Sequence, residues 1–158
     1  MRGVAGLVRD MAKRWPTAPI VVENAEEKRA AFAAADLALA ASGTVSLDLA
    51  ANNVPMVIGY DVAPLSRLII RMLLKTDTVT LVNLVSETRA VPEFLGSDCE
   101  PGPMSQALFC LLEHPEDRAN QVAAMNLTME RLGRGGEAPG LRAARSVLGA
   151  LSSAPRPR

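Results

Sequence analysis

Aromatic residues, cysteine and histidine are scarce in this chain of 158 residues. Only 3% of the residues are aromatic, two are cysteine and one is histidine. The two cysteines, Cys99 and Cys110, form no CxxC pair, so the sequence indicates neither a zinc site nor a disulfide framework. We therefore expect two reduced thiols, as in a cytosolic protein, and no metal or cofactor.

Excess charge and long apolar runs are missing as well. Lys and Arg number 17, as do Asp and Glu, so the formal net charge is zero and no overall field attracts nucleic acid. No apolar run approaches the ~20 residues of a membrane span, and the N-terminus lacks the apolar core and cleavage site of a secretory signal. We expect a cytoplasmic protein with no nucleic-acid partner.

Short apolar runs alternate with helical patterns along the chain. The runs at 20–24, 37–40, 55–60 and 78–82 predict four buried strands, because they show no polar alternation. Helices are expected over 1–15, 25–35, 45–52, 64–75, 91–95, 104–113, 115–132 and 139–151. This alternation predicts an α/β fold with a doubly wound parallel sheet. We expect one domain over 1–151, followed by a disordered proline-rich tail over 152–158.

The stretch ALAASGTVSLDLA contains the candidate site. Ser42, Gly43 and Thr44 stand between an expected strand and an expected helix, where doubly wound sheets bind ligands. Gly43 allows close approach of the backbone, and the free N–H groups of the helix favour a phosphate. Asp48 lies one helical turn beyond Thr44, where a carboxylate can hold ribose hydroxyls. From these residues alone, a plain helix cap and a solvated acid are the interpretations that the sequence favours.

Several sequence blocks, taken in order and spacing, resemble a known family. The blocks are AAADLALAASGTVSLDLA, VPMVIGY, LLKTDTVTLVNLV, AVPEFLG, CEP and HPEDRANQ. Together they resemble the C-terminal half of lipid-A-disaccharide synthase over nearly all of residues 20–151. That family consists of inverting glycosyltransferases with the GT-B fold, in which two Rossmann-like halves face each other across a cleft. The resemblance implies that residues 1–151 are a Rossmann-like domain that binds a UDP-sugar donor, the C-terminal half of such a fold.

The resemblance also implies which residues bind the substrate. These are Ser42, Gly43, Thr44, Asp48, Asn83 and Glu93. The first three match the loop expected to receive the diphosphate of UDP. Asp48 stands at the ribose-binding position, where the family usually has Glu, so its acid is one methylene shorter. Asn83 matches an Asn that the family carries in a PN pair, and Val82 replaces the usual Pro.

The function implied by the resemblance belongs to lipid A biosynthesis. The family transfers 2,3-diacylglucosamine from its UDP derivative to 2,3-diacylglucosamine 1-phosphate, which yields lipid A disaccharide 1-phosphate and UDP. The implied partners are the UDP-diacylglucosamine donor and, through another half, a lipid acceptor. The acceptor half, with the catalytic carboxylate, is expected before Met1. We therefore expect a fragment of a longer hexosyltransferase, inactive in isolation and without a catalytic residue of its own.

Two other functions and a homodimer stay open at this point. Another UDP-sugar enzyme of GT-B architecture, such as an epimerase or a different transferase, would carry a similar ASGT loop. A binding or interaction module without turnover is the alternative from another class.

A basic stripe on the expected helix 64–75 suggests membrane contact. Arg67, Arg71 and Lys75 are four residues apart, and apolar residues occupy the remaining circumference. Such a helix can lie on an anionic membrane, or cover the sheet while its cations face water. The first arrangement predicts a peripheral location on the inner face of the bacterial cytoplasmic membrane.

Overall fold

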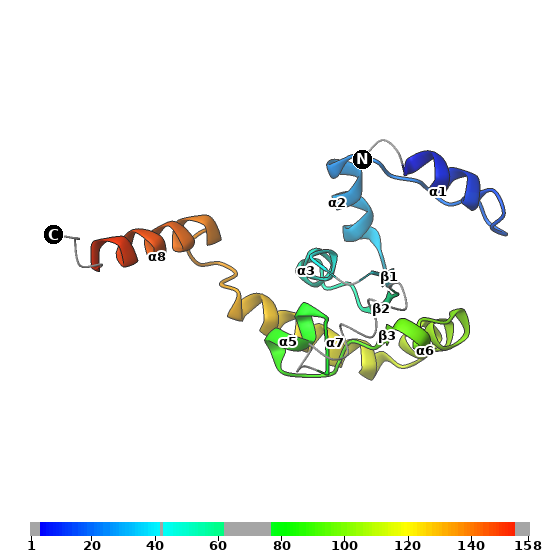
Figure 1. Ribbon diagram of the computed structural model, residues 1–158. Helices are drawn as coiled ribbons and strands as arrows, with labels where there is room; N and C mark the ends of the chain where they lie inside the picture. The colour runs from blue at the N-terminus through cyan, green and yellow to red at the C-terminus, as the bar shows by residue number, and fades with distance from the viewer. Residues whose placement is uncertain (1–3, 42, 62–76, 154–158) are drawn as a thin grey trace.

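A computed structural model describes residues 4–41, 43–61 and 77–153 of the chain (Figure 1). In these residues a parallel sheet forms from β1 (Ala38–Ala40), β2 (Met56–Tyr60) and β3 (Glu93–Leu95), with β2 in the middle. Ala40 lies opposite Ile58, and Ile58 lies opposite Glu93. The prediction of an α/β fold with a parallel sheet is confirmed.

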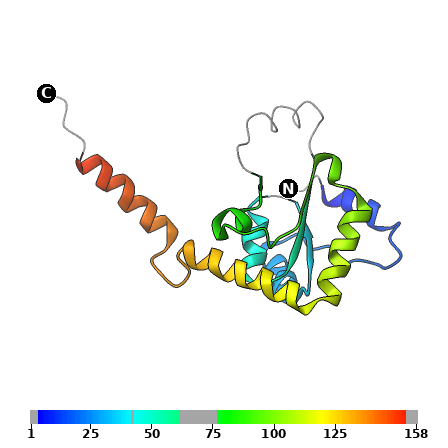
Figure 2. The same cartoon turned by 90° about the horizontal axis from the view of Figure 1, so that it is seen from below.

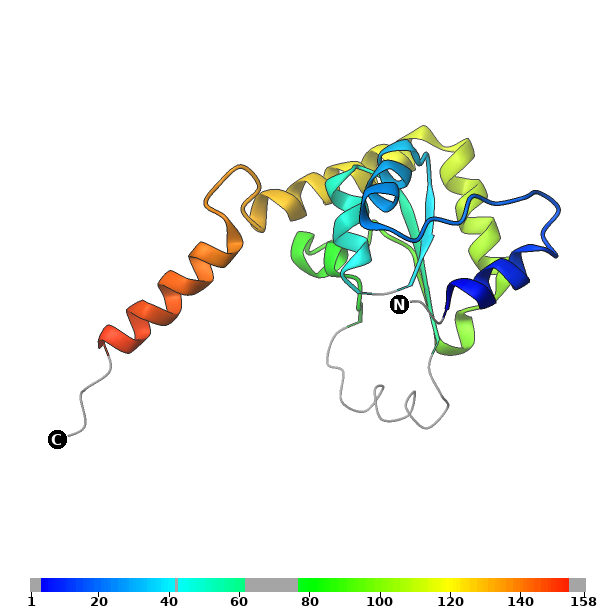
Figure 3. The same ribbon diagram turned by 90° about the horizontal axis from the view of Figure 1, so that it is seen from above.

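The helices lie on both sides of the sheet and beyond it. They are α1 (Ala5–Ala12), α2 (Ala25–Ala34), α3 (Val45–Ala51), α5 (Leu81–Ser86), the short 3-10 helix η1 (Gly96–Asp98), α6 (Pro101–Glu113), α7 (Pro115–Arg131) and α8 (Pro139–Ser153). The helices α3 and α5 lie on one side of the sheet and α6 on the other (Figure 3), and α7 contacts all three. In contrast, α8 projects away from this body (Figure 2), and residues 140–150 are all exposed.

Successive residues of β2 face opposite sides of the sheet, so the two faces pack against different helices. Met56 and Ile58 are fully buried on the side of α3, α5 and α7. They belong to a cluster with Leu49, Ala50, Val54, Val82, Val91, Ala124 and Met125. Val57 and Gly59 alternate with them and face the opposite side of the sheet. Gly59 lies so close to α6 that a Cβ would stand 2.6 Å from the Met104 sulfur. The core is therefore built from aliphatic side chains and methionine.

The strand predicted over residues 20–24 is wrong. This run is irregular in the structure, and Ile20 is 93% exposed. Within the described residues, β1 is hydrogen-bonded to β2 alone, and no strand pairs with its other edge. An apolar run becomes a strand only where a neighbour accepts its backbone hydrogen bonds. The run does end at the predicted helix cap, because Asn24 accepts a hydrogen bond from the Glu27 N–H at 2.8 Å.

Two further predictions, for residues 78–82 and 91–95, are wrong in a related way. The first run was expected as a strand, but residues 78–80 are irregular and α5 begins at Leu81. The second was expected to be helical, but it contains β3, and the Ile58 N–H donates to the Pro92 carbonyl at 2.9 Å. The strand next to β2 therefore comes from the second run. The expected helix 64–75 and the end of the tail, 154–158, lie outside the described residues, while α8 continues to Ser153.

Candidate functional site

The loop after β1 and the first turn of α3 hold the most accessible of the predicted site residues. Gly43 has φ 127°, in the region that favours glycine, and a Cβ there would meet nothing within 4 Å. Thr44 is exposed and makes no capping hydrogen bond with its side chain. The buried Ser46 hydroxyl donates instead to the Gly43 carbonyl at 2.8 Å, which fixes the turn. Ser42 lies outside the described residues.

Asp48 is also exposed, and a cation from α2 lies beside it. The Lys28 Nζ is 3.0 Å from the Asp48 Oδ2 and 5.4 Å from the centre of the Phe32 ring. Both side chains of the ion pair are about half exposed, so the pair is worth well under about 1 kcal/mol and leaves the carboxylate within reach of a ligand. Sequence reasoning missed Lys28, because nothing in the spacing links it to a residue on another helix.

Asn83 points inward from α5 and has both ends of its amide occupied. It is 1% exposed. Its Nδ2 donates to the Val91 carbonyl at 2.9 Å, and its Oδ1 accepts from the Val91 N–H at 3.0 Å. A single amide thus satisfies both backbone groups of a buried residue just before β3.

Glu93, the first residue of β3, is half buried and also has partners. Its Oε1 accepts from the Thr78 hydroxyl at 2.8 Å, from the Val79 N–H at 3.2 Å and from the Thr80 N–H at 2.5 Å. From the described part of the chain, its Oε2 receives one long bond of 3.4 Å, from the Val79 N–H. The carboxylate therefore anchors the segment that leads into α5.

The structure brings these predicted residues to the same side of the sheet. Ala40, Ile58 and Glu93 lie on one rung, and the chain leaves β1 toward Thr44 and Asp48 just beyond it. The helices α3 and α5 contact each other on this side. The predicted residues on α3 face solvent, whereas Asn83 and Glu93 hold the protein backbone. The predicted membrane residues Arg67, Arg71 and Lys75 lie outside the described part of the chain.

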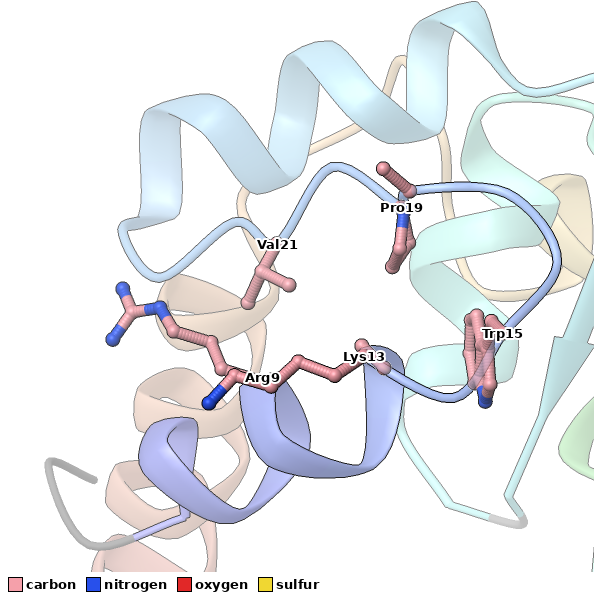
Figure 4. Close-up of a pocket in the computed structure, with 7 residues that line it drawn as sticks. Arg9, Lys13, Trp15, Pro19 and Val21 are labelled. Atoms are coloured by element: carbon pink, nitrogen blue, oxygen red, sulfur yellow. The ribbon is translucent and has the colours of Figure 1, made fainter.

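Two hollows of about 480 Å³ each lie elsewhere, around α1 and the loop after it. In the first, Arg9 and Lys13 extend from α1 along one side, and Trp15, Pro19 and Val21 lie on the loop that curves around it (Figure 4). Neither hollow is lined by a residue of the predicted site. The candidate site therefore lies at α3 and its neighbours, away from both hollows.

Neither a metal-binding cluster nor a membrane-spanning helix is found in the described residues. Over 4–41, 43–61 and 77–153, no group of three His, Cys, Asp or Glu side chains could hold a metal ion. In the same ranges, no helix combines the length and apolar character needed to cross a membrane.

Comparison with known proteins identifies the family. A family model described as lipid-A-disaccharide synthetase matches residues 11–138. The chain belongs to this family. The matched region contains α2, the sheet, α3 and the helices α5 to α7, and it ends just before α8. All the predicted substrate-binding residues fall inside it.

Curated members of the lipid-A-disaccharide synthetase family are similar to nearly the whole chain. A lipid-A-disaccharide synthase of Ruegeria pomeroyi is 55% identical over 156 residues, which cover 94% of this chain and 38% of the relative. One of Paramagnetospirillum magneticum is 44% identical, covering 92% and 37%, and one of Rhodospirillum centenum is 38% identical, covering 95% and 37%. The chain thus spans less than two fifths of the length of these relatives.

Proposed function

We propose that this chain is the donor-binding half of a lipid-A-disaccharide synthase. In this proposal it binds UDP-diacylglucosamine, and another half supplies the lipid acceptor and the catalytic carboxylate. The supporting observation is the exposed junction of β1 and α3 in a member of this family, where Gly43 leaves open space and Thr44 and Asp48 face solvent. Residues 1–151 would form the domain and 152–158 its tail.

The chemistry of the proposed site follows from the residues at this junction. Gly43 lets a diphosphate approach the backbone closely, and the Ser42 and Thr44 hydroxyls can donate to its oxygens. The Asp48 carboxylate can accept hydrogen bonds from ribose hydroxyls, and Lys28 balances its negative charge near the diphosphate. These residues bind and orient a leaving group, and none of them is proposed to attack or to remove a proton.

Titration with UDP tests the proposal. We expect calorimetry to show that the chain binds UDP, and Thr44→Ala and Asp48→Ala each to weaken binding by about 1–3 kcal/mol, because each removes a hydrogen bond to the nucleotide. Asp10→Ala serves as the control, since Asp10 forms a similarly exposed ion pair with Lys13 on α1. Transfer should be absent for the chain alone and appear when the remaining half of a full-length relative is added. A wild-type chain that does not bind UDP would refute the proposal.

We further propose peripheral membrane contact through the basic stripe of residues 64–75, since the substrates of the proposed reaction are lipids. Arg67→Glu combined with Arg71→Glu should reduce flotation with anionic liposomes several-fold, because each cation near such a surface contributes about 1 kcal/mol. Arg29→Glu with Arg134→Glu makes the same charge change outside the stripe and should leave flotation unchanged. Equal flotation of the stripe variant and the wild type would contradict this location. Homodimerisation stays a prediction, which sedimentation velocity on the same sample can test.

A further inference from the structure

The Glu93 carboxylate takes the place of a strand partner for residues 78–80. Three donors from consecutive residues converge on its Oε1: the Thr78 hydroxyl and the Val79 and Thr80 N–H groups. Within the described residues no strand pairs with this segment, and buried N–H groups require a partner. Thr78 and Thr80 are both fully buried, so water cannot replace the carboxylate there.

The Asn83 side chain makes a second connection, to the residue two positions before Glu93. Its amide donates to and accepts from the backbone of Val91, as a neighbouring strand would. Val91 is itself 2% exposed and belongs to the core cluster. The middle of α5 is therefore attached to the residues that lead into β3.

A third connection, at the surface, joins the segment before α5 to the loop after it. The Arg89 guanidinium hydrogen-bonds to the Asp77 carboxylate, with its Nε 3.2 Å from the Oδ2. Together with the backbone N–H of Asp77, this bond holds the pKa of that carboxyl below its ordinary value. The segment before α5 and the loop after α5 are thus fastened to each other as well as to β3.

The position of α5 matters for the proposed donor site because α3 packs against it. Leu49 and Ala50 of α3 share the core cluster with Val82 of α5 and Val91. Asp48 precedes these two core residues directly in the same short helix. A shift of α5 away from β3 would therefore move α3 and reorient the Asp48 carboxylate.

We infer that Asn83 and Glu93 are positioning residues of the donor site, which hold α5 against β3 and through α5 fix α3, and that neither contacts the nucleotide. The inference rests on the proposed function. It assigns direct contact to the exposed Thr44 and Asp48, and support to two side chains whose polar atoms are taken up by the backbone.

A comparison of Glu93→Gln with Glu93→Ala tests the inference. The glutamine retains a carbonyl oxygen in place of Oε1, and its two lone pairs can still accept from the two nearest donors, the Thr78 hydroxyl and the Thr80 N–H, but it has no charge. We expect Glu93→Gln to bind UDP within about twofold of wild type, and Glu93→Ala to bind about tenfold more weakly. Hydrogen exchange of the Thr80 amide should accelerate in the alanine variant and stay near wild type in the glutamine variant. Glu130→Ala, on the exposed face of α7, is the control and should change neither measurement.

A different pair of results would refute the inference. If Glu93→Gln weakens UDP binding about tenfold while the Thr80 amide stays protected, then Glu93 contacts the nucleotide through its charge and the inference is refuted. This holds even if the alanine variant does not fold. A wild-type chain that binds no UDP would instead refute the proposed function. The exchange measurement needs no nucleotide, so the two failures are distinguishable.

Discussion

Replacing Ile58 with alanine is expected to lower the free energy of unfolding by about 2–5 kcal/mol. Ile58 is fully buried at the centre of β2, with Ala40 on one side and Glu93 on the other. Its side chain lies in the cluster that joins the sheet to α3, α5 and α7. Only 3% of the residues are aromatic, so few large side chains could move into the cavity that alanine leaves. Because a domain of this size is stable by only about 5–15 kcal/mol, the loss should be visible in the midpoint of urea unfolding.

Leu39→Ala is the matched control for this prediction. Leu39 lies in β1, next to Ala40, and loses a comparable number of methyl and methylene groups on substitution. It is 55% exposed, however, so the change should cost less than about 1 kcal/mol. Equal losses in the two variants would show that the core does not lie on the face of β2 where the structure places it.

The elements that the sequence predicts best are those whose signals are local. Pro115 opens α7 at the expected residue, since proline is favoured in the first helical turn. Asn24 precedes α2 and caps it through its own side chain. The run PMVIGY forms the central strand β2, whose first three residues, Met56 to Ile58, are buried on both faces and apolar. Each of these signals is complete within one turn or one strand.

Strand pairing could not be predicted in the same way. The run 78–82 is TVTLV, rich in β-branched residues, whereas 91–95 is VPEFL, with a proline and a glutamate, so residue type favours the wrong run as the strand. The outcome depends on Glu93, whose side chain satisfies the backbone of residues 78–80 while its own backbone pairs with β2. An irregular segment anchored by one carboxylate has no signature in the order of residue types.

The candidate site also has features that the sequence predicts and features that it does not. The accessible position of Thr44 and Asp48 follows from their place after an apolar run and at the start of a helix. The orientation of Asn83 does not, because its partner Val91 is brought to it by the turn between α5 and β3. Resemblance to a family marks Asn83 as a site residue without saying whether it contacts a ligand or the backbone. The hydrogen bonds of the folded chain supply that distinction.

Replacing Asn83 with alanine should destabilise the chain about as strongly as the Ile58 substitution. The change leaves the Val91 N–H and the Val91 carbonyl without their partner in a buried place. Each unsatisfied group costs about 1–3 kcal/mol, so we expect a total of about 2–6 kcal/mol in urea unfolding. Asn126→Ala is the control, because Asn126 is exposed on α7, where its Oδ1 accepts from the Arg134 guanidinium at 3.0 Å.

Asn83→Asp separates the donor from the acceptor half of this amide. The aspartate can still accept from the Val91 N–H, but in its ionised form it places a negative oxygen against the Val91 carbonyl. Burial beside that carbonyl should raise the pKa of the introduced carboxyl in the folded state above its unfolded value. A raised folded pKa means that stability is recovered as the pH falls, because the protonated acid can donate to the carbonyl. The difference in unfolding free energy between this variant and wild type should therefore be smaller in acidic than in neutral buffer. A pH-independent difference would show that the Asn83 amide does not hold Val91 through its N–H group.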